Sequence, residues 1–184
     1  METIIGTSRD FLFSEILPKN CICAEIGVRD GFNAQRILNI SNPKKLYLID
    51  SWDYTNIRGI LEEDRNRLMG AAKNQYEGVI EKFKNNNNIE IIRKLSVEAS
   101  KQFEDNYFDW VYIDAFHDYL SVKEDCESWC PKIGGGGYLC GHDYVDPTKP
   151  DVLKAVNEFC KENKLEIIYK GCGRNEASEW CIKK

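Results

Sequence analysis

The segment from Cys21 to Leu38 constrains the fold more than any other part of the chain. It reads CICAEIGVRDGFNAQRIL, in which mostly apolar residues run into a glycine-containing turn, Gly27 to Gly31, and a helical pattern follows. Glycine lets the backbone approach a ligand closely, and the first N–H groups of a helix lack partners, so this order predicts a ligand site. The turn lacks both the Gly-Lys-Ser/Thr ending of a phosphate-binding loop and the G-x-G-x-x-G spacing of a dinucleotide fingerprint. Its pattern is E-x-G-x-x-x-G, beginning at Glu25.

Alternating strand and helix patterns fill most of the chain. Five segments read as strands, at 21–26, 45–50, 89–95, 108–114 and 138–141, and helical patterns lie at 8–17, from Phe32 onward, and at 97–103, 119–130 and 150–163. This alternation predicts an α/β fold with a doubly wound, Rossmann-like sheet that is covered by helices on both faces. The last two strands, 165–170 and 177–182, are separated by a short loop, which predicts an antiparallel hairpin at the edge.

Two glycine-containing segments are expected to interrupt regular structure. In 52–87 apolar residues recur at helical spacing, but Gly70 and Gly78 argue against a single long helix. The glycine run 134–137 is expected to form a tight turn before the fifth strand. A chain of 184 residues is one ordinary domain, so 1–184 is expected to be a single domain with 52–87 as a helical insertion.

Composition excludes some partners and favours one compartment. The net charge is −5 and no block of lysine and arginine occurs, so nothing favours binding to nucleic acid or to an anionic membrane. No apolar run reaches transmembrane length, and the first residues do not form a signal peptide. The eight cysteines include no Cys-x-x-Cys pair, and their spacing suits small buried hydrophobic side chains better than zinc ligands. The expected location is cytoplasmic.

Polar residues gather at the predicted carboxyl ends of the parallel strands, where ligands bind in sheets of this kind. Both histidines of the chain belong to this set, which comprises Glu25, Asp30, Asp50, Asp114, His117, Asp118, His142 and Asp143. Two histidines interleaved with aspartates at one edge favour a functional site. Asp50 can accept both hydroxyls of a ribose, although it can equally cap the following turn.

Three other residues have simpler interpretations. Asp118 is expected to cap the helix that follows it, and Asp125, in the middle of that helix, is expected on a solvated face. Trp52 follows Asp50 closely enough to pack on a bound base, or it belongs to the core.

On these motifs the chain resembles class I S-adenosylmethionine-dependent methyltransferases. The stretch from Glu25 to Gly31 resembles their first cofactor motif, and Asp50 matches their ribose-binding acid. The sequences YIDAFHDY (112–119) and GHDY (141–144) resemble, more narrowly, the small-molecule group that includes macrocin-type sugar O-methyltransferases. The resemblance implies a seven-stranded sheet of order 3-2-1-4-5-7-6 with strand 7 antiparallel. It also implies S-adenosylmethionine as cofactor, bound by Glu25, Gly27, Gly31, Asp50, Ser96 and Asp114.

The same resemblance implies a divalent metal between the ends of the fourth and fifth strands. Its ligands by position are Asp114, His142 and Asp143, and the histidine departs from the acidic or acid-amide pair of the group. Because Mg²⁺ prefers oxygen, the departure weakens the case for Mg²⁺ and leaves Mn²⁺, iron or no metal open. Without a metal, His117 or His142 is the candidate base, and Asp114 changes from ligand to base or orienting group.

The expected function is transfer of a methyl group from S-adenosylmethionine to a hydroxyl of a small polar metabolite, a sugar or a sugar-containing natural product, with or without Mg²⁺ or Mn²⁺. Two alternatives stay open. An NAD(P)-dependent Rossmann oxidoreductase is disfavoured because the third fingerprint glycine is absent. A non-catalytic cofactor-binding module is disfavoured because the reactive residues at the edge are intact.

The expected partner is a small-molecule methyl acceptor, with no nucleic acid and no membrane. The segment 52–87 is the natural substrate lid because it is long and enters from the cofactor edge. Its polar residues suit a polar acceptor; they are Arg58, Arg65, Arg67, Asn74, Gln75 and Tyr76. The sequence leaves the oligomeric state open, a homo-oligomer included.

Overall fold

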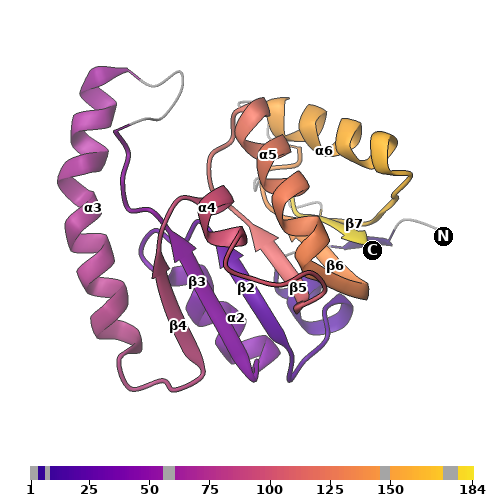
Figure 1. Cartoon of the computed structure of the whole chain (residues 1–184), viewed down its shortest axis with the longest axis horizontal. Coiled ribbons are helices and arrows are strands. Elements are labelled where there is room, and N and C mark those ends of the chain that lie inside the picture. The colour runs from indigo at the N-terminus through magenta and orange to yellow at the C-terminus, as the bar shows by residue number, and fades with distance from the viewer. Residues whose placement is uncertain (1–3, 7–8, 56–60, 146–149, 172–177) are drawn as a thin grey trace.

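A single mixed sheet organises the molecule. The computed structural model describes residues 4–6, 9–55, 61–145, 150–171 and 178–184. Within these residues the sheet has eight strands in the order β1-β7-β8-β6-β5-β2-β3-β4 (Figure 1). Their bounds are β1 (Ile4–Gly6), β2 (Ile22–Ile26), β3 (Lys45–Asp50), β4 (Ile89–Arg93), β5 (Phe108–Ile113), β6 (Ile133–Gly141), β7 (Ile167–Gly171) and β8 (Trp180–Lys183).

The predicted strand order is confirmed. Without β1, the sheet reads β4-β3-β2-β5-β6-β8-β7, which is the expected 3-2-1-4-5-7-6. β8 is the antiparallel strand, pairing with both β6 and β7, and β2 to β6 pair in parallel. The additional strand β1 pairs in parallel with β7 at the edge and was not predicted. Its three residues are too few to show a strand pattern in the sequence.

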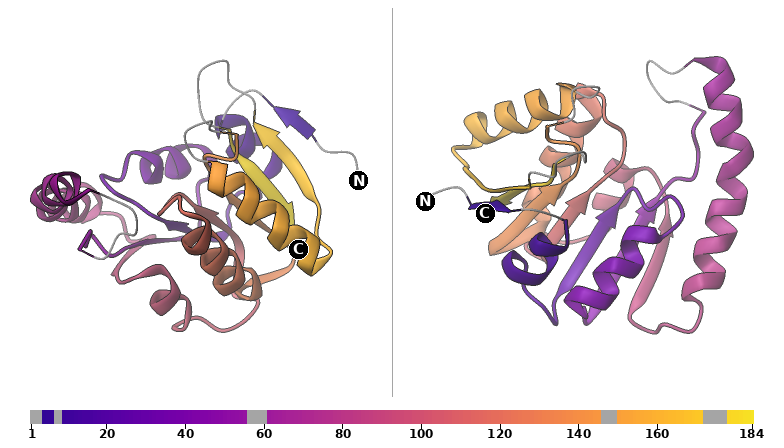
Figure 2. Two further views of the ribbon diagram at one scale, coloured as in Figure 1. Left: turned by 90° about the horizontal axis from the view of Figure 1, so that it is seen from above. Right: turned by 180° about the vertical axis from the view of Figure 1, so that it is seen from behind.

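Helices cover both faces of the sheet (Figure 2). They are α1 (Arg9–Phe11), its π-helical continuation η1 (Leu12–Ile16), α2 (Phe32–Ser41), α3 (Glu62–Phe83), α4 (Ser96–Ser100), α5 (Tyr119–Trp129), the 3₁₀ turn η2 (Cys130–Lys132) and α6 (Pro150–Asn163). Side chains of η1, α2 and α3 share one buried cluster, and those of α4, α5 and α6 share the other. The sheet therefore has a core on each face.

Strand β2 shows how the sequence builds these two cores. Cys23 belongs to the cluster with η1, α2 and α3, and the next residue, Ala24, belongs to the opposite cluster. Successive residues of a strand point to opposite faces of the sheet. Because helices cover both faces, both side chains are fully buried. The cysteines behave as small hydrophobic residues: all seven described are free thiols, and six of them are buried. No described helix is long and apolar enough to cross a membrane.

The expectation that Gly70 and Gly78 interrupt the helical segment is wrong. α3 runs without a break for 22 residues, and no atom outside the helix lies within 4 Å of a Cβ built at either glycine. Glycine in a helix costs about 1 kcal/mol relative to alanine. That cost does not stop a helix anchored by the buried residues Ala72, Val79 and Phe83.

The expectation of a tight turn at 134–137 is also wrong. The glycines lie inside β6, which begins at Ile133, and the register with β5 shifts between Phe108 and Trp110. A side chain at Gly137 would meet the backbone oxygen of Asp109 at 2.5 Å. The glycines therefore form an irregular bulge that lets two strands approach closely, rather than a turn between elements.

Candidate active site

The turn after β2 is shaped by contact with the end of β5. Gly27 has a φ of +87°, and a Cβ there would overlap the backbone carbonyl of Asp114. The N–H of Gly27 donates to Ile49 O at 2.8 Å, and that of Asp114 donates to Ile26 O at 2.7 Å. Only glycine fits this left-handed position without strain and without displacing β5. The first motif is thus joined directly to Asp114, the residue that follows β5.

Replacement of Gly27 by alanine is expected to lower the free energy of unfolding by about 2–4 kcal/mol, because the new methyl group meets backbone and the φ is unfavourable. Urea denaturation measures the change. Gly70→Ala is the matched control, since open space surrounds that glycine in α3. It should stabilise the protein by about 0.4–1 kcal/mol. A neutral effect of Gly27→Ala would contradict the tight approach of turn and strand.

Gly31 has a different place from the one predicted. It has a φ of +73° and precedes α2, but a Cβ there would lie 2.8 Å from the Phe83 ring. Its carbonyl accepts a hydrogen bond of 2.9 Å from Lys82 Nζ. Gly31 therefore packs the turn against α3 and is not among the residues that line the cavity described next.

A cavity of about 1260 Å³ opens at the carboxyl edge of the sheet. Five of the six predicted cofactor residues line it: Glu25, Gly27, Asp50, Ser96 and Asp114. His117 lines it as well, whereas His142 and Asp143 lie beyond its described lining. Because a pocket for one drug-sized ligand measures roughly 300–1000 Å³, the volume allows a cofactor and part of a second substrate.

Glu25 places a buried carboxyl group on the cavity wall. The residue is 1% exposed, its Oε1 accepts a hydrogen bond of 2.9 Å from Asn33 Nδ2, and its Oε2 has no hydrogen-bond partner. Burial raises its pKa to about 8, although the bond from Asn33 acts in the opposite direction. An acceptor that is desolvated and only half satisfied suits a ligand cation such as an ammonium group.

Asp50 ends β3 and is held by the two neighbouring turns. Its Oδ2 accepts bonds of 2.9 Å from the N–H groups of Val28 and Arg29, and its Oδ1 accepts one of 2.8 Å from Trp52 N. The turn-capping interpretation is therefore correct, and it does not exclude a contact between Asp50 and a ribose. A carboxylate has about four acceptor sites, so a ribose hydroxyl can still bind.

Ser96 belongs to a buried network that the sequence did not reveal. Its Oγ accepts a hydrogen bond of 2.8 Å from Trp129 Nε1. Asp125 lines the same cavity and is 4% exposed, so its expected place on a solvated face is wrong. Burial raises the pKa of Asp125 to about 7, against a lowering by its hydrogen bond with Ser96. Asp118, by contrast, caps α5 as predicted, accepting from Ser121 N.

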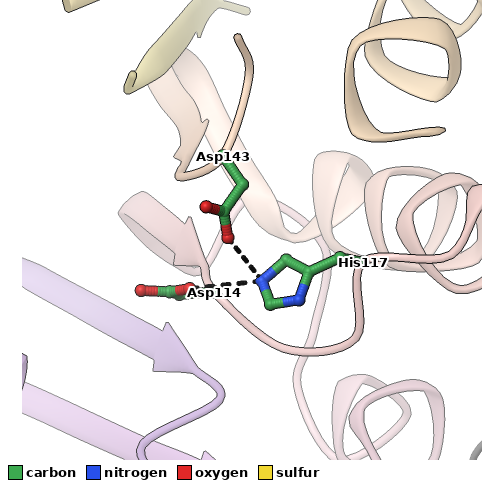
Figure 3. Close-up of side chains that lie close together, drawn as sticks. All are labelled: Asp114, His117 and Asp143. Carbon is green, nitrogen blue, oxygen red and sulfur yellow. Dashed lines mark ion pairs between the residues drawn. The ribbon is translucent and has the colours of Figure 1, made fainter. Parts of the chain in front are cut away.

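Two aspartates and a histidine meet at the ends of β5 and β6 (Figure 3). His117 Nε2 lies 2.6 Å from Asp143 Oδ2 and 3.6 Å from Asp114 Oδ1. Asp143 is 2% exposed and has a left-handed backbone with a φ of 59°. Non-glycine residues in this conformation are uncommon and concentrate at functional sites.

His142 lies beside this group rather than inside it. Its Nδ1 is 3.2 Å from Asp143 Oδ1 and 3.8 Å from Asp114 Oδ1, and its Nε2 is 3.6 Å from Glu179 Oε1. Glu179, at the entry to β8, was not predicted and is 4% exposed. Arg9 of α1, also not predicted, contacts Glu179 and Asp114 from the other side.

The residues present fit a divalent metal, with one change to the predicted ligands. Asp114, His117 and Asp143 each offer a donor atom, and these atoms all lie within 4.8 Å of one another. His117 thus takes the place predicted for His142 in this arrangement. Two carboxylates with one imidazole suit Mn²⁺ or Fe²⁺ better than Mg²⁺.

The polar residues predicted for a substrate lid do not face the cavity. Arg58 lies outside the described residues, and the other five are not among those that line the cavity. The Tyr76 ring instead packs against Trp52 in a tilted arrangement, with centroids 4.8 Å apart. Trp52 is 1% exposed and donates to Arg29 O, so it supports the turn and is unavailable to a base. From this region Tyr54, Leu68 and Lys82 line the cavity.

Comparison with solved structures shows the fold. The chain is similar to spermidine synthase from Thermotoga maritima (TM-score 0.63, 18% identity), covering 95% of this chain and 58% of that one. It is similar to Aeropyrum pernix fibrillarin in complex with natively bound S-adenosyl-L-methionine (0.61, 12%; 90% and 67%). It also resembles a SAM-dependent methyltransferase from Aquifex aeolicus (0.62, 13%; 96% and 93%). The chain thus spans less than two thirds of the spermidine synthase.

Comparison with sequence families shows the family. None of the curated protein sequences matches the chain. A family model described as a methyltransferase domain matches residues 24–144, from the middle of β2 to the residue after Asp143. The matched region contains the glycine turn, Asp50 and the cluster at the ends of β5 and β6. The chain therefore belongs to this family of methyltransferase domains and has the class I S-adenosylmethionine-dependent methyltransferase fold.

Proposed function

We propose that this protein transfers the methyl group of S-adenosylmethionine to a hydroxyl of a small polar metabolite, a sugar or a sugar-containing natural product. The observation that carries the proposal is one cavity lined by two complementary sets of groups. The first is the half-satisfied carboxyl of Glu25, and the second is the pair Asp114 and His117. The first suits the ammonium of the cofactor, and the second suits deprotonation of an acceptor.

The cofactor needs little chemical help from the protein, because its sulfonium already activates the methyl carbon. Glu25 binds the ammonium, the turn at Gly27 lets the backbone approach the amino-acid part, and Asp50 takes the ribose hydroxyls. Alignment of oxygen, methyl carbon and sulfur can contribute about 7–11 kcal/mol to lowering the barrier. The match to a methyltransferase-domain family favours this cofactor over a nicotinamide.

The acceptor hydroxyl loses its proton to His117 in the metal-free version. Asp143, 2.6 Å from His117 Nε2, orients the imidazole and stabilises its protonated form. The oxygen forms a bond to the methyl carbon as the carbon–sulfur bond breaks, and the electron pair stays on sulfur. In the alternative version Asp114, His117 and Asp143 hold a divalent metal, which would lower the pKa of the hydroxyl.

A small polar acceptor is supported by the remaining volume and by the residues that border it. Tyr54, Leu68 and Lys82 close the side formed by α3 and the loop before it, with one hydroxyl, one apolar side chain and one cation. We assign the acceptor-facing role to this part of the predicted lid, in place of the arginines.

A thermal-shift screen with S-adenosylhomocysteine, S-adenosylmethionine, NAD and NADP tests the cofactor. A ligand at about 100-fold above its dissociation constant stabilises the native state by about 2.7 kcal/mol. For a chain of this size the melting temperature should rise by roughly 5–10 °C with the two adenosyl sulfur compounds only. A shift with the nicotinamides alone would end the methyltransferase proposal. A panel of hydroxylated acceptors then tests the reaction, with formation of S-adenosylhomocysteine as the measured product. Turnover with any of them distinguishes an enzyme from a binding module.

A further inference from the structure

Arg9 places a partly buried guanidinium group at the cavity. Its side chain is 16% exposed, and its Nε donates to Glu179 Oε1 at 3.0 Å. Nη1 donates to Asn33 Oδ1 at 3.0 Å, and Nη2 lies 3.5 Å from Asp114 Oδ2. The guanidinium carbon is 5.4 Å from the centroid of the Tyr112 ring. Residues of α2 and β5, together with Asp114 just after β5 and Glu179 just before β8, therefore fix the position of one cation from α1.

The guanidinium keeps donors for a ligand. Arginine has five N–H groups, and the contacts with described residues use one on each nitrogen. Burial alone would lower the pKa of Arg9, but Tyr112, Asp114 and Glu179 together raise it above its usual value. Arg9 is thus a permanent cation that lines the same cavity as Glu25.

Asn33 couples this cation to the buried carboxyl. Its Nδ2 donates to Glu25 Oε1 at 2.9 Å while its Oδ1 accepts from Arg9. One amide side chain therefore separates an acceptor with an unpartnered oxygen from a donor with N–H groups to spare. The free amino-acid end of a ligand carries an ammonium and a carboxylate on one carbon atom. The two ends of the Glu25–Asn33–Arg9 chain complement those charges.

We propose that Arg9 binds the α-carboxylate of the methionine part of the cofactor while Glu25 binds its ammonium. The chain Glu25–Asn33–Arg9 then selects a cofactor with a complete amino-acid end over one that lacks the carboxylate. This inference rests on the proposed function, which supplies the cofactor. It adds a specificity residue from outside the segment that matches the family model, since that match begins at residue 24.

Calorimetric titration of Arg9→Met tests the inference, since methionine keeps an unbranched stem over Tyr112 but removes the charge. Binding of S-adenosylhomocysteine should weaken roughly 10- to 100-fold, as expected for a lost bond between charged groups. Binding of methylthioadenosine, which has no amino-acid end, should change by less than about twofold. The wild type should prefer S-adenosylmethionine over its decarboxylated form, which keeps sulfonium and ammonium, and the variant should lose that preference.

Arg67→Met is the matched control, because Arg67 is 77% exposed, pairs with Asp64 of its own helix and does not line the cavity. It should leave both affinities unchanged. Arg9→Lys keeps the charge but not the planar fork, so an intermediate loss confined to S-adenosylhomocysteine is expected, even if Arg9→Met fails to fold. Equal losses for S-adenosylhomocysteine and methylthioadenosine, or an unchanged preference for the carboxylate, would overturn the inference. Failure of the wild type to bind S-adenosylhomocysteine would instead overturn the proposed function.

Discussion

Glu25→Gln is expected to stabilise the apo-protein at pH 8 and at the same time to weaken its binding of the cofactor. The folded protein holds the pKa of Glu25 at about 8, against 4.5 for the ordinary carboxyl, because burial disfavours the charged form. Between these two values the native state binds more protons than the unfolded state. The free energy of unfolding of the wild type therefore falls as pH rises from about 4.5 to about 8.

The glutamine variant lacks this contribution, since its amide does not titrate. Its stability relative to the wild type should increase across that window and reach a plateau above pH 8, with a gain on the order of a few kcal/mol. Urea denaturation at a series of pH values measures the difference. Asp125, whose pKa is raised to about 7, contributes to both proteins and cancels in the comparison. A constant difference between pH 5 and pH 9 would contradict the raised pKa of Glu25.

The same substitution should weaken the binding of S-adenosylhomocysteine roughly 10- to 100-fold, because an amide replaces the carboxylate that faces the ammonium. Binding at pH 7 should release close to one proton from the wild type and none from the variant. Calorimetry in two buffers of different ionisation enthalpy measures that release. Glu90→Gln is the control, because Glu90 lies on β4, pairs with Lys45 and is outside the cavity. Unchanged affinity of Glu25→Gln would show that this carboxyl does not meet the ammonium.

Residues at strand ends could be predicted from the sequence because an apolar run fixes where a buried strand stops. Glu25 is the penultimate residue of such a run and Asp50 is the last residue of another, and parallel strands bring their ends to one edge. The same logic placed Asp114 and His117 correctly. These placements required only local sequence patterns and the rule that crossovers between parallel strands are right-handed.

Arg9, Asp125 and Glu179 could not be predicted, because their positions depend on packing between distant segments. Asp125 has polar neighbours in its helix, which is the pattern of a solvated face, yet α5 buries it beside Ser96. Arg9 reaches the cavity only because α1 lies next to α2 and to Glu179, the residue before β8. A periodic pattern of apolar residues carries no information on such contacts between distant segments.

The exchange of His142 for His117 in the cluster has a backbone origin. A continuing strand would direct His142 and Asp143 to opposite faces. Instead β6 ends at Gly141 and Asp143 adopts a φ of 59°, which brings its carboxylate to His117. Because sequence patterns carry little information on single left-handed residues other than glycine, the choice between the histidines could not be made in advance.

Asp143→Asn is expected to lower kcat by about 10²–10⁴-fold while the affinity for S-adenosylhomocysteine stays the same. Asparagine tolerates the left-handed backbone at this position, so the fold should be retained. The variant removes the negative charge 2.6 Å from His117 Nε2, which both versions of the mechanism require. Asp143 does not line the cofactor cavity, so binding and catalysis should separate. Asp105→Asn is the control, because Asp105 pairs with Lys132 away from the cavity.

Titration with Mn²⁺, monitored by electron paramagnetic resonance, together with measurements of kcat, then distinguishes the two versions. If the cluster holds a metal, the wild type should bind one Mn²⁺, and Asp143→Asn and His117→Ala should each weaken that binding, since each ligand contributes to the site. If His117 is the base, Mn²⁺ should leave wild-type activity unchanged, and the acidic limb of the pH profile of kcat should disappear in His117→Ala. An equal loss of kcat and cofactor affinity in Asp143→Asn would contradict both versions, because the cluster would then support the fold of the cavity rather than the acceptor hydroxyl.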